Sequence, residues 1–247
     1  MMRWLLLLFA CTILGQPAIA QEVDSTGPKT VVAGLVTITN NGISVVPAFS
    51  LGKPAAIVDA FIARSVFAFE PELRWGLDGK PWSIILWGRY RQDRGNFHMT
   101  IGGHPALNFV TTTVTKNQTE KEIIAARRYL AGELNPSYSV AKHVILGVYY
   151  LYSHGFEPDA ARNINFLALR TTFLGVPLAG RYFVSFAPQL FYLNVDARDG
   201  FYFHSLLTVG KRNFPFFIGA QVNRTIQTNI VQPDDFIWNL SLSYSIQ

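Results

Sequence analysis

The chain is poor in two things that most secreted or soluble proteins contain. Cys11 is its only cysteine, so the sequence excludes an internal disulfide and a cluster of thiolates that could hold a metal. Charged residues make up 15% of the chain, whereas a soluble domain usually has about a quarter. Because 49% of the residues are hydrophobic, we expect much of the surface to face something other than water.

Long apolar runs are also missing. The run from Trp4 to Gly15 is too short to cross a bilayer as a helix, which needs about 20 residues. It lies between Arg3 and the small residues Ala18-Ile19-Ala20, which is the order found in a secretory signal. We therefore predict a signal peptide at residues 1–20, and a lipoprotein leader ending at Cys11 is the alternative.

The chain does contain a repeated alternation of apolar and polar side chains, with a period of two residues. From Phe236 to Ile246, "FIWNLSLSYSI" alternates apolar or aromatic side chains with mostly polar ones. Such alternation is typical of a β-strand with one apolar and one polar face. Similar segments occupy 66–77, 81–91, 97–114, 138–152, 163–175, 181–195, 200–210 and 216–228.

The number of strands is less certain near the start of the chain. Segments 30–39, 43–50 and 55–63 are further candidates, and 120–134 is the weakest because its Ala, Leu, Glu and Arg also suit a helix. A single-chain bacterial barrel has an even number of strands. We therefore expect 30–39 or 43–50 not to be a strand, which leaves about 12 strands within a range of about 10–14.

The combined pattern favours an all-β, transmembrane antiparallel β-barrel. A closed barrel is the only structure besides the helix that satisfies every backbone group inside a bilayer. The polar faces of the strands hold Ser, Thr, Asn, Gln and Gly more than Lys and Glu, as lumen faces can. We expect a polar lead-in at 21–29 and one barrel domain at 30–247, and a soluble secreted sandwich or lipocalin-like barrel is the alternative.

Aromatic residues near the ends of strands predict an interfacial girdle. Asp78-Gly79 is a two-residue hairpin signal, and a turn there places Trp75 directly opposite Trp82 on the apolar face. With Trp238 and Tyr244, these tryptophans are the expected girdle residues.

Charged side chains on the same hairpin are the candidate lumen site. Glu70, Glu72 and Arg74 share the polar face of one strand, and Arg89 and Arg91 share that of the next. The hairpin register makes Glu70 and Arg89 diagonal neighbours, within reach of each other. These residues predict either a charged constriction that selects solutes or an ion-paired plug that fills a narrow barrel.

Other chemistry finds little support in the sequence. His98 and His104 are too far apart along one strand to bind one metal, and no spacing typical of a cofactor or nucleotide site occurs. The net charge of +5 is scattered, so we expect no nucleic-acid partner. Ser153 and His154 are adjacent and would point to opposite faces of a strand, which disfavours a nucleophile–base pair. We expect no catalytic residue, with a lipid hydrolase or acyltransferase as the alternative.

The leader, the repeated strands with aromatic ends and the alternating last strand resemble outer-membrane β-barrel proteins of Gram-negative envelopes. Phrases such as "NNGISVVPAFSLGKPAA" and "ARRYLAGELNPSYS" are similar to barrels of this size that carry no assigned activity. The resemblance implies outer-membrane location, contact with outer-membrane lipids, and recognition of the last strand by the barrel-insertion machinery. In that class the last strand usually ends in an aromatic residue, and here Tyr244 is followed by Ser245-Ile246-Gln247.

The function expected from these features is a narrow channel for small polar or anionic solutes. A non-conducting structural or surface-interaction barrel is the alternative. The sequence favours no particular solute, loop partner or oligomeric state.

Overall fold

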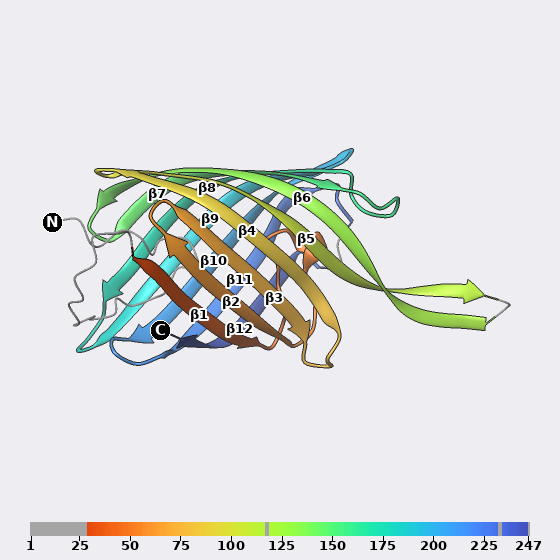
Figure 1. Cartoon of the computed structure of the whole chain (residues 1–247), viewed down its shortest axis with the longest axis horizontal. Coiled ribbons are helices and arrows are strands. Elements are labelled where there is room, and N and C mark those ends of the chain that lie inside the picture. The colour runs from red at the N-terminus through yellow and green to blue at the C-terminus, as the bar shows by residue number, and fades with distance from the viewer. Residues whose placement is uncertain (1–28, 117–118, 232–233, 247) are drawn as a thin grey trace.

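The computed structural model describes residues 29–116, 119–231 and 234–246, and these residues form a closed antiparallel barrel of twelve strands (Figure 1). The predicted signal peptide lies outside the described residues, as does the lead-in except for Lys29. The strands are β1 Thr30–Thr39, β2 Ala55–Arg64, β3 Phe67–Gly76, β4 Pro81–Arg94, β5 Phe97–Lys116, β6 Thr119–Ala141, β7 Val144–Gly155, β8 Asn163–Pro177, β9 Tyr182–Val195, β10 Arg198–Lys211, β11 Phe216–Thr228 and β12 Phe236–Ile246. Within the described residues, no helix is long and apolar enough to cross a membrane.

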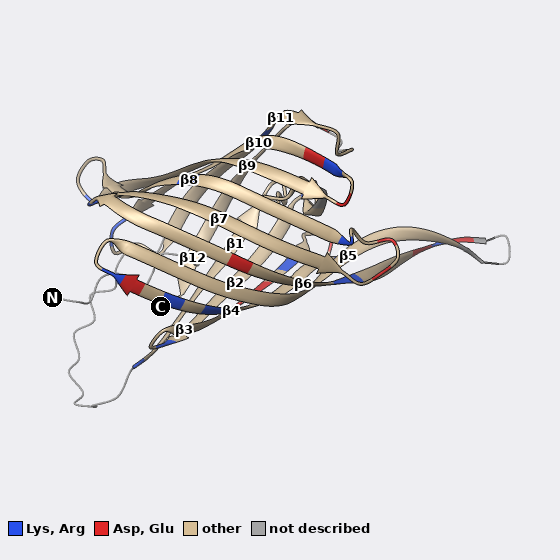
Figure 2. Cartoon of the chain, turned by 90° about the horizontal axis from the view of Figure 1, so that it is seen from above, with Lys and Arg blue, Asp and Glu red and all other residues tan. Residues whose placement is uncertain are grey.

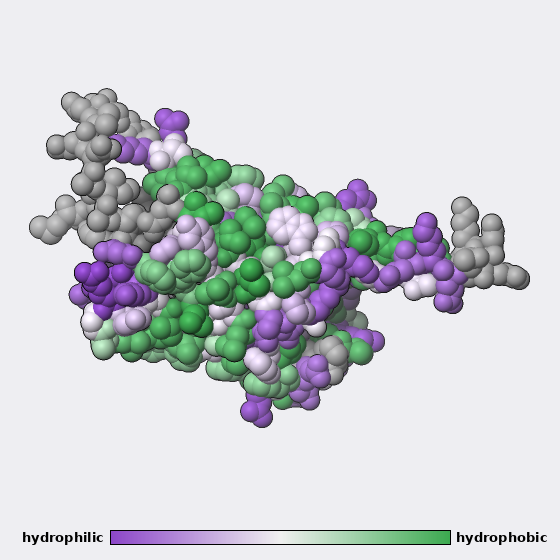
Figure 3. All heavy atoms as spheres, turned by 90° about the horizontal axis from the view of Figure 1, so that it is seen from below, coloured by the Kyte–Doolittle hydropathy of each residue, from purple (hydrophilic) through white to green (hydrophobic). Residues whose placement is uncertain are grey.

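The two faces of the strands differ in polarity. In β12, Leu240 and Leu242 are 52% and 51% exposed on the outer wall, whereas Asn239 and Ser245 are buried. Ser243 points inward and shares a hydrogen bond of 2.8 Å with Thr37 of β1. The outer wall is therefore a mostly apolar band with polar groups toward its ends (Figure 3), and the polar groups of the other face line the lumen.

The last strand closes the barrel. β12 pairs with β1 from Gly34–Ile246 to Thr39–Ser241 and with β11 on its other side. The predicted barrel of about 12 strands is thus confirmed. Segment 43–50 is not a strand and contains the 3-10 helix η1, Pro47–Phe49.

The helix considered for 120–134 does not form. This segment belongs to β6, which pairs with β5 from Thr119 to Tyr138 and with β7 from Tyr129 onward. Pairing with β5, and from Tyr129 also with β7, satisfies its backbone and overrides the helical preference of its side chains.

The two ends of the barrel differ. β1 begins and β12 ends at the same end, which we call the terminal end, and the connections there are 65–66, 95–96, 142–143, 178–181 and 212–215. The opposite end, which we call the loop end, carries the longer connections 40–54 and 156–162. There the β5–β6 hairpin extends well beyond the barrel (Figure 1).

Candidate functional site: the barrel lumen

A belt of ion-paired side chains crosses the lumen on the β3–β6 side. Arg89 of β4 donates to Glu70 of β3, and its Nε donates to Glu133 Oε1 of β6 at 2.6 Å. Arg91 of β4 donates to the other oxygen of Glu70. Glu70 and Glu133 are each 4% exposed, so both carboxylates are shielded from solvent. The diagonal contact predicted between Glu70 and Arg89 is therefore present.

The belt continues around the wall through residues that the sequence did not single out. Tyr149 of β7 donates its hydroxyl to Glu133 Oε2 at 2.8 Å, and Arg170 of β8 lies 4.0 Å from the centre of the Tyr149 ring. Arg170 Nε donates to Gln189 Oε1 of β9 at 2.9 Å. Gln189 in turn lies 3.2 Å from a ring nitrogen of His204 in β10. The belt thus spans β3 to β10.

The charges in the middle of the lumen balance. Glu72 and Arg74, both predicted to face the lumen, form an ion pair with each other on β3. The inward-facing acids of β2, β3 and β6 and the inward-facing arginines of β3, β4 and β8 are equal in number: Asp59, Glu70, Glu72 and Glu133 against Arg74, Arg89, Arg91 and Arg170. Because the signs cancel, this part of the lumen presents no ring of one charge, which is the feature that usually sets ion selectivity.

An apolar cluster fills the lumen toward the loop end. Tyr202 and Leu193 are fully buried, and Phe166 and Phe191 are each 2% exposed. The rings of Phe191 and Tyr202 stack with their centres 5.0 Å apart. In a wide water-filled lumen these inward side chains would be exposed, so their burial shows that the interior here is packed.

The cluster is covered by a segment that folds into the barrel. Residues 41–51 of the β1–β2 connection, which we call the insert, place Val45, Val46 and Phe49 against it. Phe49 also contacts Tyr129 of β6 edge to face, with ring centres 5.2 Å apart. The insert therefore lies across the lumen at the loop end.

Hydrogen bonds fix the insert to three parts of the wall. Trp82 Nε1 donates to the Phe49 carbonyl at 2.8 Å, and Asn223 Nδ2 of β11 donates to the Val45 carbonyl at 3.2 Å. Asn239 Nδ2 of β12 donates to the carbonyl of Asn41 at 3.0 Å. The first two bonds satisfy backbone carbonyls, and the third adds a second donor to the Asn41 carbonyl, which also accepts from Thr39 Oγ1 at 3.0 Å.

An ion pair outside the barrel wall holds the far end of the connection. Lys53 Nζ lies 2.5 Å from Asp78 Oδ2 in the β3–β4 turn. The hydrogen bond from Lys53 holds the pKa of Asp78 below its usual value. The connection is thus tied to the rim where it leaves the lumen.

The prediction that Trp82 belongs to an outer girdle is wrong. Arg74 pairs with Ser83 and Trp75 pairs with Pro81, so Trp82 is the extra residue of a β-bulge. The bulge turns the Trp82 ring into the barrel, where it is 2% exposed and lies 4.7 Å from the Arg74 guanidinium. Trp75 consequently does not lie opposite Trp82.

The other predicted girdle residues lie on the outer face. Trp238 and Tyr244 are 50% and 43% exposed, and Trp75 is half-buried. The sequence did not predict a hydrogen bond on the outer face: the Tyr150 hydroxyl donates to Asn165 Oδ1 at 2.9 Å. Such pairing satisfies polar groups on an otherwise apolar wall.

We predict that Trp82→Phe loosens the insert. The substitution keeps an aromatic ring in the lumen but removes the N–H that bonds the Phe49 carbonyl, which should cost about 1 kcal/mol of folding free energy. Urea titration of the refolded protein in lipid vesicles measures this cost. Trp238→Phe, on the outer face, is the matched control, and an equal loss in both variants would contradict the role given to Trp82.

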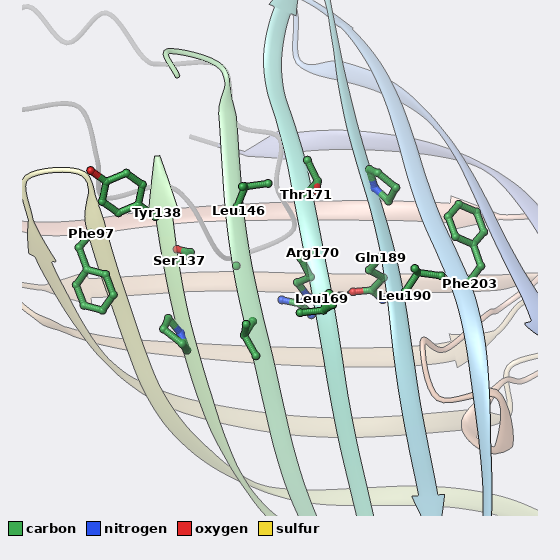
Figure 4. Close-up of a pocket in the computed structure, with 14 residues that line it drawn as sticks. Phe97, Ser137, Tyr138, Leu146, Leu169, Arg170, Thr171, Gln189, Leu190 and Phe203 are labelled. Carbon is green, nitrogen blue, oxygen red and sulfur yellow. Dashed lines mark hydrogen bonds between the residues drawn. The ribbon is translucent and has the colours of Figure 1, made fainter. Parts of the chain in front are cut away.

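A hollow lies on the outer wall, and we call it the wall hollow (Figure 4). Its volume is about 630 Å³, and it runs across β5 to β10. The outer-face residues that line it are Phe97, Pro136, Tyr138, Leu146, Val148, Leu169, Thr171, Pro188, Leu190 and Phe203. The inward-facing residues Ser137, Gly147, Arg170 and Gln189 also line its floor, so the lining is mostly apolar on the outer face, with aromatic residues at both ends.

The remaining candidates do not form a reactive site. Ser153 is buried in the lumen, whereas His154 lies on the outer wall, 3.4 Å from Asn163 Oδ1. His98 is paired with Asp93 at 2.7 Å and with Ser139 at 2.9 Å. Across the described part of the chain, no group of three His, Cys, Asp or Glu side chains could hold a metal ion.

No known protein family and no curated protein matches the sequence. Among solved structures, the KdgM porin in complex with disordered oligogalacturonate aligns with a TM-score of 0.54 and 8% identity, over 89% of this chain and 100% of that chain. The β-domain of the Bordetella autotransporter BrkA gives a TM-score of 0.46 and 9% identity, over 87% and 98%. Outer-membrane expressed OmpT of Vibrio cholerae gives 0.45 and 9%, over 92% and 100%.

The KdgM porin, with a TM-score above 0.5, indicates the class of fold: the chain shares its barrel architecture, here a closed antiparallel barrel of twelve strands. At such low identity the likeness establishes the fold and leaves the activity to the residues of the lumen.

Proposed function

We propose that the chain is an integral outer-membrane barrel whose lumen is closed in its resting state. The observation that carries this proposal is the burial of inward side chains along the barrel: Glu70 and Glu133 in the charged belt, and Tyr202 and Leu193 beside the insert. Two successive layers, one ion-paired and one apolar, block the path between the barrel ends. The protein then acts as a structural or surface-interaction barrel and not as an open pore.

The energetics of the belt support a closed resting state. A buried charge without a partner is costly, so paired carboxylates and guanidinium groups hold one another in place. Opening a path through the belt would require separating Arg89 from Glu70 and Glu133 and hydrating all three groups. The equal numbers of acids and arginines also remove the electrostatic attraction that would draw ions of one sign inside.

A second candidate is a narrow path for small anionic solutes that opens when the insert moves. Arg91 Nε and Nη1 are buried and make no hydrogen bond to any described residue, and the same is true of His204 Nε2. These nitrogen atoms could form hydrogen bonds with a solute in the lumen. The KdgM porin, which was solved in complex with disordered oligogalacturonate, has a similar fold at 8% identity.

Removing the insert separates the two candidates. Replacing residues 42–51 with a short Gly-Ser linker removes the apolar layer and leaves the charged belt. If the insert is the gate of an anion path, liposomes containing the variant should swell in small anionic solutes while those containing the intact protein do not. If the belt alone closes the barrel, as we expect, neither should swell, and swelling with the intact protein would contradict a closed resting state.

A further inference from the structure

The terminal end of the barrel is strongly basic. Seven Lys or Arg residues lie there in or next to the strand ends: Lys29, Arg64, Arg94, Lys142, Arg181, Lys211 and Arg212. Asp93 is the one carboxylate at this end among the described residues, and it is paired with His98. Figure 2 shows charged segments at both ends of the barrel, with mostly uncharged strands between them.

The loop end differs because four of its cations have acidic partners, although Arg162 and Arg198 there form no ion pair with a described residue. Lys53, Lys80, Arg127 and Arg128 form ion pairs with Asp78, Glu122, Asp159 and Glu157. By contrast, none of the seven basic side chains at the terminal end forms an ion pair with a described residue. Their positive charge is therefore available to an external anion.

The wall hollow opens close to two of these cations. Phe97 and Tyr138, at one end of the hollow, are paired across β5 and β6. Arg94 is paired with Phe97 across the β4–β5 hairpin, and Lys142 follows directly on β6, which ends at Ala141. Both cations are exposed. One place on the barrel thus combines positive charge with an adjoining apolar hollow.

We propose that this place binds an anionic phospholipid, with its phosphate against Arg94 and Lys142 and an acyl chain in the wall hollow. A barrel with short turns at the end where its termini lie has that end in the periplasm, so the site faces the periplasmic leaflet of the outer membrane. Each Lys or Arg near a membrane surface adds to the electrostatic attraction for anionic headgroups. Leu146, Leu169 and Leu190 supply the apolar contact.

The test measures lipid binding to the refolded full chain by native mass spectrometry, with phosphatidylglycerol and phosphatidylcholine as probes. We expect phosphatidylglycerol to bind about tenfold more tightly. The double variant Arg94→Gln/Lys142→Gln should lose this preference. Arg162→Gln/Arg198→Gln removes two exposed cations from the loop end and should keep it.

A second pair of variants tests the acyl chain. Thr171→Phe partly fills the wall hollow and should weaken both lipids, whereas Leu242→Phe, on the outer face of β12, should weaken neither. Equal binding of the two lipids, or equal losses in the two arginine-containing double variants, would overturn the proposal. The proposal would also be overturned if polyglutamate displaced phosphatidylglycerol and Thr171→Phe had no effect. The basic end would then bind an acidic protein and not a lipid.

Discussion

Arg89→Gln should destabilise the barrel by about 3–5 kcal/mol, because it leaves buried carboxylates without their cation. Arg89 is the shared partner of Glu70 and Glu133, and the three side chains are 10% exposed or less. After the substitution Glu70 keeps Arg91, but Glu133 keeps only the Tyr149 hydroxyl. Urea titration in lipid vesicles gives the change in folding free energy.

A double variant and a surface control identify the cause. Adding Glu133→Gln to Arg89→Gln removes the unpaired charge and should restore part of the loss. Lys80→Gln breaks an exposed ion pair with Glu122, which should cost about 0–1 kcal/mol. If Arg89→Gln costs no more than Lys80→Gln, water reaches the belt and the lumen is not closed there.

Leu240→Arg should cost about 2–4 kcal/mol, because it places a charge on the lipid-facing wall. Leu240 is 52% exposed on the outer face of β12, in the middle of the strand. Folding free energies measured in vesicles of defined thickness report this cost.

The matched control is Ile124→Arg on the β5–β6 hairpin. Ile124 is 44% exposed, similar to Leu240, but it lies where β5 and β6 pair only with each other, and this hairpin extends beyond the barrel (Figure 1). Its substitution should therefore change stability by no more than about 0.5 kcal/mol. An equal cost at both positions would contradict the placement of the hairpin outside the membrane.

The sequence predicted the barrel well because the period of two repeats in almost every strand. The alternation of Leu240 and Leu242 with Ser241 and Ser243 is a local property, and it sets which face meets lipid. The contact between Glu70 and Arg89 could also be predicted, since hairpin register depends on a short turn.

The positions of Trp82 and Glu133 could not be derived in the same way. A bulge adds one residue to a strand and reverses the side-chain faces beyond it, and no residue in "DGKPWS" marks its place. Glu133 lies in a segment whose composition also suits a helix. The signal that could have found Glu133 and Arg170 is a lone charge in the middle of an alternating strand, where only a polar lumen tolerates it.

The position of the insert inside the barrel could not be predicted from the sequence, for a different reason. The sequence leaves open whether 30–39 or 43–50 is a strand, and the structure has a strand only at the first. The place of 43–50 inside the barrel depends on Asn223 and Trp82, which are distant in the chain. Such contacts follow only from the closed sheet, because closure brings β4 and β11 to either side of the insert.

The central claim is that the lumen is closed at rest, and single-channel recording tests it most directly. The intact protein, refolded and inserted into a planar bilayer in potassium chloride, should give no stable conductance steps. Steady stepwise openings by the intact protein would contradict the claim, because ions would then pass both the ion-paired belt and the insert.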